Sequence, residues 1–136
     1  MEEPVPEAGA GMPFRILIVD DSSVMRAIIA RTVGLCGIVD PEVVQAADGA
    51  AALACLKASA FDLVLLDINM PVMDGEQLLA AMRADPSLKA SSVIVASTES
   101  SEPRIRRLRL MGAEFVHKPF RPEELALAIT RVSAGR

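Results

Sequence analysis

Two short apolar runs in this chain each end on a carboxylate, and they constrain the fold more than any other feature. Residues 61–66, FDLVLL, are followed directly by Asp67, and residues 16–19, ILIV, are followed by Asp20 and Asp21. A nearly continuous apolar run of this length is typical of a strand buried on both faces of a parallel sheet. Since ligands of such sheets bind beyond the carboxyl ends of the strands, we expect the three carboxylates to meet at one edge.

Three clustered carboxylates repel one another unless a cation joins them. Asp20, Asp21 and Asp67 offer hard oxygen ligands, which suit Mg²⁺. The sequence therefore predicts a magnesium site at this edge of the sheet.

Strand and helix patterns alternate five times along the chain. Strands are expected at residues 15–19, 42–46, 61–66, 92–97 and 115–118. Helices are expected at residues 23–36, 49–58 and 103–111, in a segment that ends before Pro86, and from residue 122 onward. The first helix should direct Met25, Ile28, Ile29, Thr32 and Val33 inward. Five such units predict a single doubly wound α/β domain with helices on both faces of a parallel sheet.

The length of 136 residues suits one domain with its own core, and a hydrophobic content of 51% agrees with that. We expect residues 1–13 to form a disordered tail and residues 14–134 to form the domain. A net charge of −4 provides no basic field, which argues against nucleic acid as a partner.

No segment has a signal-peptide pattern, and no apolar run approaches the length that spans a membrane. The protein is therefore expected to be soluble and cytoplasmic, without a membrane partner. Cys36 and Cys55 are isolated in the sequence and are expected to be buried free thiols.

Polar side chains also close the last two strands: Ser97 and Thr98 close the fourth, and Lys118 closes the fifth. In a doubly wound sheet these side chains converge on the edge that carries the acids. Strand alternation aims Ser97 in the same direction as Val95 and favours it over Thr98, although Thr98 remains a competitor for its role. His117, the single histidine, is expected to be a surface residue.

These residue types together suit the handling of a phosphoryl group. Asp20 and Asp21 would hold Mg²⁺, which neutralises charge on the transferring group. Asp67 would attack phosphorus, since carboxylates accept phosphoryl groups when a metal offsets their charge. Lys118 would supply a positive charge and hydrogen-bond donors, and Ser97 would supply a hydroxyl.

On these motifs the chain resembles the response regulator receiver domains of two-component signalling. The matching residues are Asp20-Asp21, Asp67, Asn69, Met70-Pro71, Asp74-Gly75, Ser97, Phe115 and Lys118-Pro119-Phe120. The resemblance covers residue 14 to the end of the chain and implies a flavodoxin-like (βα)5 fold with strand order 2-1-3-4-5. Residues 20–26, DDSSVMR, are most similar to the chemotaxis-type stand-alone regulators, and no effector domain is expected after the last helix.

The resemblance implies that Asp67 is phosphorylated from a phosphohistidine of a sensor histidine kinase or a histidine phosphotransfer protein. Mg²⁺ would be held by Asp21, Asp67 and the backbone carbonyl of Asn69, with Asp20 acting partly through water. Lys118 would clamp the phosphoryl group.

The resemblance also implies a cis peptide between Lys118 and Pro119, and a switch pair made of Ser97 and Phe115. Ser97 would swing toward the phosphoryl oxygens, and Phe115 would turn inward to fill the vacated space. Phe115 stands where many relatives have tyrosine, so a hydroxyl able to report to partners is absent.

Three side chains are expected to flank the phosphoryl group: Asn69, Thr98 and Glu99. Asn69 and Glu99 are polar and able to orient a water molecule, which predicts a short-lived phosphoryl group. Thr98 stands where many relatives have alanine and is the likeliest cause of any slowing.

The helix at residues 103–111 carries an outward face of Arg106, Arg107 and Leu110, while Ile105, Leu108 and Met111 should pack on the sheet. The outward face is either a solvated surface or a docking surface for an acidic partner. The resemblance favours docking of a protein target on the fourth helix, fifth strand and fifth helix. The protein is expected to be a monomer or a weak, phosphorylation-dependent dimer.

We expect a phosphorylation switch rather than an enzyme that acts on an external substrate. Two other functions are compatible with the same residues. An aspartyl phosphotransferase or phosphatase would use the same acids, but such enzymes often carry an acid two residues after the nucleophile, where this chain has Asn69. A purely structural receiver-like module is disfavoured because Asp20, Asp21, Asp67 and Lys118 are all present.

Overall fold

The computed structural model describes residues 13–38, 40–88 and 91–133. Within these ranges five parallel strands form one sheet in the order β2-β1-β3-β4-β5, as the sequence predicted. The strands are β1 (Phe14–Val19), β2 (Pro41–Ala46), β3 (Leu63–Leu66), β4 (Ser92–Ser97) and β5 (Ala113–His117). Because β1 and β3 are neighbours in this order, their carboxyl ends lie side by side.

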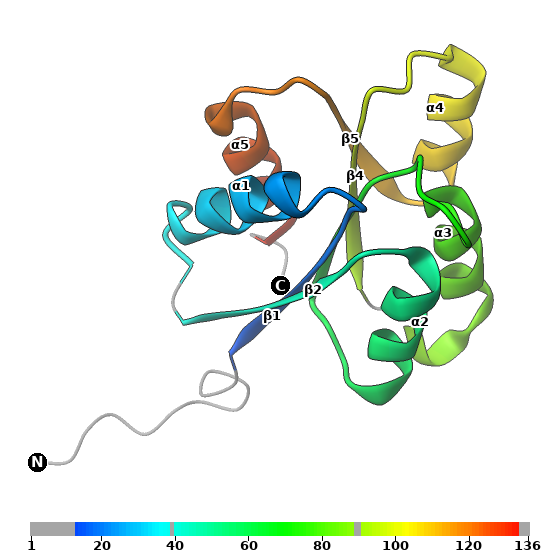
Figure 1. Ribbon diagram of the computed structural model, residues 1–136, viewed down its shortest axis with the longest axis horizontal. Coiled ribbons are helices and arrows are strands. Elements are labelled where there is room, and N and C mark those ends of the chain that lie inside the picture. Colours follow the sequence, from blue (N-terminus) through cyan, green and yellow to red (C-terminus); the bar gives the residue numbers. More distant parts are fainter. Residues whose placement is uncertain (1–12, 39, 89–90, 134–136) are drawn as a thin grey trace, which may run out of the picture.

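Helices cover both faces of the sheet (Figure 1). One face is covered by α1 (Ser23–Gly34) and α5 (Pro122–Ser133), and the other by α2 (Gly49–Ala58), α3 (Gly75–Ala84) and α4 (Glu102–Leu110). A short 3₁₀ turn, Pro86–Leu88, follows α3.

The core has two layers because successive strand residues point to opposite faces of the sheet. In β3, Val64 and Leu66 pack into the layer beneath α2, α3 and α4, whereas Leu63 and Leu65 pack into the layer beneath α1 and α5. All four are buried, which explains why this strand is a continuous apolar run.

Polar side chains at the helix starts set where the helices begin. Ser22, Asp48, Asp74 and Ser101 each accept a backbone N–H from the first turn of the helix that follows. At α3 the cap is reciprocal, because the Gln77 side chain also accepts the backbone N–H of Asp74. Ser101 starts α4 at Glu102, one residue before the expected Pro103.

Two strand boundaries differ from the sequence-based expectation. β3 begins at Leu63 rather than at residue 61; just before it, the Asp62 carboxylate accepts the backbone N–H of Arg15 at 2.8 Å. β5 runs from Ala113 to His117, so Lys118 follows the strand instead of ending it.

Several expectations about side-chain burial were wrong. Ile28 is exposed, because it lies at the edge of a narrow inward stripe formed by Ile29, Thr32 and Val33. Cys36 and Cys55 are free thiols, as expected, but each is half-buried rather than buried.

The first helix ends at Gly34 rather than near residue 36. Of the expected tail, residues 1–12 lie outside the described residues. None of the helices in the described ranges has the length and apolar character needed to cross a bilayer.

Candidate functional site

Three carboxylates gather where β1 and β3 end. Asp20 and Asp21 follow β1, Asp67 follows β3, and one oxygen from each lies within 4.8 Å of the others. Asp20 and Asp67 are only 2% and 8% exposed, whereas Asp21 faces solvent. The sequence-based prediction that these acids share one edge of the sheet is therefore confirmed.

Lys118 reaches the same place from the end of β5. Its ammonium Nζ lies 2.7 Å from Oδ2 of Asp20 and 3.7 Å from Oδ1 of Asp67. Its backbone N–H donates to the carbonyl of Ser97 at 2.9 Å, which fixes the start of the loop after β5 against the end of β4. We call the group of Asp20, Asp21, Asp67 and Lys118 the acidic crevice.

Asp20 is held firmly on both sides. Its Oδ1 accepts the backbone N–H of Ser22 at 2.9 Å, while its Oδ2 accepts Lys118. Its backbone is anchored by Arg26, which donates to the carbonyl oxygen at 2.7 Å. The carboxylate therefore has a fixed direction toward the crevice.

Asp67 is under opposing influences. Burial raises its pKa, and the nearby charge of Asp20 acts in the same direction. Lys118 and the backbone N–H groups of Asn69 and Ile68 act to lower the pKa, but the pKa remains above the ordinary aspartate value. A crevice with three carboxylates and one ammonium leaves an excess of negative charge on a poorly solvated group.

The donor set fits a hard divalent cation. Three carboxylates, one of them solvent-facing, offer oxygen ligands within a span that one ion can bridge. A cation there would also offset the charge that raises the pKa of Asp67. The backbone N–H of Asn69 hydrogen-bonds to the Asp67 carboxylate, so the Asn69 backbone lies beside this member of the crevice.

The end of β4 distinguishes Ser97 from Thr98. Ser97 is fully buried and its Oγ accepts the backbone N–H of Glu99 at 3.2 Å, whereas Thr98 is exposed. Strand alternation thus turns Ser97 inward and Thr98 outward, as expected for the favoured candidate.

Phe115 lies on the same face of the sheet. It is 9% exposed and belongs to the core layer that contains Ile105 and Leu108 of α4. Its ring centroid is 4.8 Å from that of His117 in an edge-on contact, and His117 itself is exposed, as expected. The peptide between Lys118 and Pro119 is cis, as the resemblance implied.

The first turn of α3 packs directly on the backbone of Asp67. The N–H of Gly75 donates to the carbonyl of Ile68 at 2.8 Å, and a Cβ at Gly75 would overlap the carbonyl oxygen of Asp67. Glycine is required at this position by close approach, and the position of α3 is therefore tied to that of the crevice.

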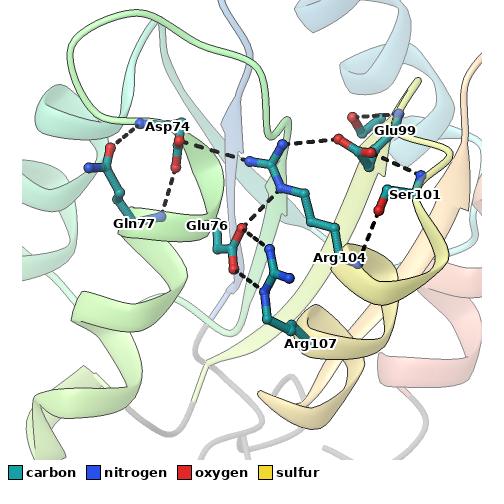
Figure 2. Close-up of polar contacts among 8 residues, drawn as sticks. Asp74, Glu76, Gln77, Glu99, Ser101, Arg104 and Arg107 are labelled. Carbon is teal, nitrogen blue, oxygen red and sulfur yellow. Dashed lines mark hydrogen bonds and ion pairs between the residues drawn. The ribbon is translucent and has the colours of Figure 1, made fainter.

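A second charged group, which the sequence analysis did not identify, joins α3 to α4. Arg104 of α4 lies 3.0 Å from Glu76, 3.0 Å from Glu99 and 3.9 Å from Asp74 (Figure 2). Arg107 lies 3.0 Å from the other oxygen of Glu76. We call Asp74, Glu76, Glu99, Arg104 and Arg107 the Arg104 cluster.

The Arg104 cluster corrects one expectation. Glu99 was expected to be able to orient a water molecule beside the phosphoryl site, but Arg104 binds one of its oxygens and the N–H of Ser101 binds the other at 2.9 Å. Arg107 points outward, as expected, with its side chain 56% exposed, and it also pairs with Glu76. A signal was available in the sequence, since Arg104 and Arg107 are three residues apart on a helix and flank its buried stripe.

The rest of the expected outward face of α4 is exposed. Leu110 is 80% exposed and Arg106 is also exposed, while Ile105 and Leu108 are buried against the sheet, as expected. Met111 packs against the same core layer and is partly buried.

Comparison with known proteins agrees with this geometry. The family model described as "Response regulator receiver domain" matches residues 16–130. The chemotaxis protein CheY of Pseudomonas aeruginosa is 37% identical over 120 residues, covering 88% of this chain and 95% of that protein.

Two further relatives differ in how much of them this chain covers. The structure of CheY4 of Vibrio cholerae is 35% identical with a TM-score of 0.78, covering 88% of this chain and 98% of that one. A protein-glutamate methylesterase/protein-glutamine glutaminase of Rhodospirillum centenum is 35% identical over 90% of this chain, which spans 31% of the length of that relative.

The chain belongs to the response regulator receiver domain family. It is a CheY-like receiver, a phosphoryl-accepting domain of two-component signalling.

Proposed function

We propose that Asp67 is the phosphoryl acceptor and that the acidic crevice carries out the transfer. The observation that carries this proposal is the convergence of three carboxylates and the Lys118 ammonium on one point. Asp67 is the member of the crevice next to both Lys118 and the two other acids, and its backbone is fixed by the N–H bond to the carbonyl of Val19 at 2.9 Å.

The transfer requires an ionised carboxylate. An Oδ of Asp67 attacks phosphorus, the P–N bond of a donor phosphohistidine breaks, and the imidazole leaves with the bonding electrons. The Nζ of Lys118 lies 3.7 Å from Asp67 Oδ1, so the ammonium can form an ion pair with the oxygens of the incoming phosphoryl group. Asp21, Asp67 and the Asn69 carbonyl would hold Mg²⁺, with Asp20 acting partly through water, and the bound ion would neutralise charge on the transferring group.

The alternative of an aspartyl phosphatase acting on an external substrate is disfavoured. Such an enzyme needs a general acid near the attacking carboxylate, and Asn69 cannot supply a proton in that role. Phosphorylated Asp67 is therefore proposed to be the signal itself rather than an intermediate in the hydrolysis of an external substrate.

Ser97 and Phe115 are proposed as the pair that reports phosphorylation. Ser97 is buried at the end of β4, and Phe115 lies on the same face of the sheet against α4. A movement of the Ser97 hydroxyl toward a phosphoryl group on Asp67 would alter the packing next to Phe115. The signal would leave through α4, β5 and α5, where Arg106, Arg107 and Leu110 lie.

The proposed partners are a sensor histidine kinase or a histidine phosphotransfer protein on the input side and a protein target on the output side. We propose that the protein is a monomer, or a weak dimer when phosphorylated. Its cytoplasmic location stays a prediction from the sequence.

The lifetime of the phosphoryl group follows from its surroundings. Asn69 is exposed and its backbone N–H bonds to the Asp67 carboxylate, so water has a route to the phosphorus atom, while Thr98 is the residue that would slow its approach. A short-lived phosphoryl group is proposed on this basis, with Asn69 able to orient the attacking water.

The test is phosphorylation by acetyl phosphate, followed by intact-mass measurement. We expect a mass increase of one phosphoryl group in the presence of Mg²⁺, none in EDTA, and none in Asp67→Asn. Asp48→Asn is the matched control, because Asp48 is a helix cap outside the crevice. Full labelling of Asp67→Asn, or undiminished labelling in EDTA, would overturn the proposal.

A further inference from the structure

Arg104 connects the two loops that border Asp67. On one side it binds Glu76 and approaches Asp74 at the start of α3, and on the other it binds Glu99 in the loop after β4 (Figure 2). Its side chain is 24% exposed, so these ion pairs are less screened than ordinary surface pairs.

The α3 side of this connection is rigid. Gly75 packs against the carbonyl oxygen of Asp67, and its N–H donates to Ile68. Arg107 binds Glu76 as well, which fixes the carboxylate that receives Arg104. Arg104 is thus anchored to a helix start that cannot shift without moving Asp67.

The other side of the connection leads to the Ser97 hydroxyl. The backbone N–H of Glu99 donates to Ser97 Oγ at 3.2 Å, and the Glu99 carboxylate is bound by Arg104 and by the N–H of Ser101. Any movement of the Ser97 side chain that releases this N–H also disturbs the residue that Arg104 binds.

We propose that Arg104 is a positioning residue that holds residues 97–101 in their unphosphorylated arrangement and so opposes the switch. This inference rests on the proposed roles of Asp67 and Ser97. Phosphorylation would have to detach Glu99 from Arg104, and the free energy of that ion pair would be subtracted from the affinity of the site for a phosphoryl group. Removal of the pair should then raise that affinity.

The direction of the effect separates this mechanism from simple electrostatics. Loss of a positive charge near an anion site lowers anion affinity by Coulomb's law, whereas loss of a restraint raises it. Arg104→Gln removes both the charge and the restraint. Arg104→Lys keeps the charge but loses the planar fork that reaches several carboxylates, so it isolates the restraint.

The experiment measures the Kd of beryllofluoride with Mg²⁺, a stable mimic of an aspartyl phosphate, by titration of backbone amide resonances. The variants are Arg104→Gln, Arg104→Lys, Glu99→Ala and the double change Glu99→Ala with Arg104→Lys. Arg109→Gln, an exposed arginine of the same helix, is the control for charge. Thermal unfolding of each variant reports whether the fold is kept.

We expect Arg104→Lys and Glu99→Ala each to bind the mimic roughly fivefold more tightly than the parent, which is a typical coupling, and Arg104→Gln to bind it more tightly than the parent but less tightly than Arg104→Lys. The double change should add nothing to Glu99→Ala, and Arg109→Gln should bind the mimic no more tightly than the parent. Weaker binding by Arg104→Gln, unchanged binding by Arg104→Lys, or additive effects in the double change would overturn the inference.

These outcomes are distinct from a failure of the proposed function. A parent protein that does not bind the mimic, or an Asp67→Asn variant that binds it equally well, would contradict the role of Asp67. A parent that binds the mimic while its Arg104 variants are unchanged would contradict the role of Arg104 alone.

Discussion

The acidic crevice and the Arg104 cluster both combine carboxylates with basic side chains, but their electrostatics differ. In the crevice three carboxylates face one ammonium, and the pKa of Asp67 is raised by burial. In the Arg104 cluster three carboxylates face two arginines, and the pKa of Glu76 is lowered, chiefly by its hydrogen bond from Arg107. The acidic crevice lacks positive charge and therefore suits a bound cation and phosphoryl transfer. In the Arg104 cluster two guanidinium groups balance most of the negative charge, which suits a structural link.

This contrast shows why a cluster of charges alone does not identify a reactive site. What separates the two is the balance between burial and compensation. Asp20 and Asp67 are buried at strand ends, whereas Glu76 lies at the start of a helix, where solvent reaches it and the helix dipole favours its charge.

The largest effect is expected when the one ammonium group of the acidic crevice is removed. Lys118→Met leaves Asp20 and Asp67 without their ammonium, so the rate of phosphorylation by acetyl phosphate should fall by about two orders of magnitude. Mg²⁺ should bind more tightly, since it no longer competes with Lys118 for Asp20. Mass-resolved time courses and Mg²⁺ titrations provide the measurements.

Lys57→Met is the control for Lys118→Met, because Lys57 is an exposed lysine of α2. It should match the parent in both assays. Phosphorylation of Lys118→Met at the parental rate would show that the ammonium is a structural partner of Asp20 rather than part of the reactive group.

A second prediction concerns the contact that joins the two regions. Gly75→Ala places a Cβ against the carbonyl oxygen of Asp67, which would force α3 away from the crevice. We expect the free energy of unfolding, measured in urea, to be about 2 kcal/mol lower than that of the parent. Gly34→Ala, at the end of α1 with open space around it, should instead stabilise the protein by about 0.5–1 kcal/mol.

A Gly75→Ala protein as stable as the parent would mean that α3 can shift freely relative to Asp67. The rigid anchor assumed for Arg104 would then be lost.

The smallest expected effect tests the compensation of the Arg104 cluster. Because the folded-state pKa of Glu76 is lowered, its stabilising contribution is complete above the unfolded-state value of about 4.3 and is lost as the pH falls through the lowered folded value. Solvent screening limits the contribution to under about 1 kcal/mol.

The measurement for Glu76 compares urea unfolding of the parent and Glu76→Gln at pH 7 and at pH 3. The parent should be more stable at pH 7, and the difference should shrink toward zero at pH 3. A difference that is constant with pH would show that the Glu76 charge contributes nothing.

The acidic crevice was predicted from the sequence, whereas for the Arg104 cluster the sequence offers only the three-residue spacing of Arg104 and Arg107. Asp20 and Asp67 follow apolar runs, and the parallel strand order then brings those run ends together without any knowledge of side-chain conformation. Arg104 depends on the rotation of α4 and on how far an arginine side chain extends toward a neighbouring helix, which hydrophobic periodicity does not specify.

The same reasoning explains the smaller errors. Strand 61–66 was expected two residues too long because the apolar pattern does not show that the Asp62 carboxylate, rather than a backbone carbonyl, accepts the N–H of Arg15. The engagement of both Glu99 oxygens was not foreseen because its partners, Arg104 and the Ser101 N–H, belong to a helix start whose position is set by tertiary packing.

The two free thiols allow each layer of the molecule to be followed separately. Cys36 packs against the layer under α1 and α5, and Cys55 against the layer under α2, α3 and α4. Burial raises the pKa of Cys36, whose thiol also donates to the carbonyl of Thr32 at 3.1 Å, so this sulfur is a poor nucleophile until its helix end opens. The alkylation rate of each thiol in the native protein therefore reports how often the structure opens on one side of the sheet.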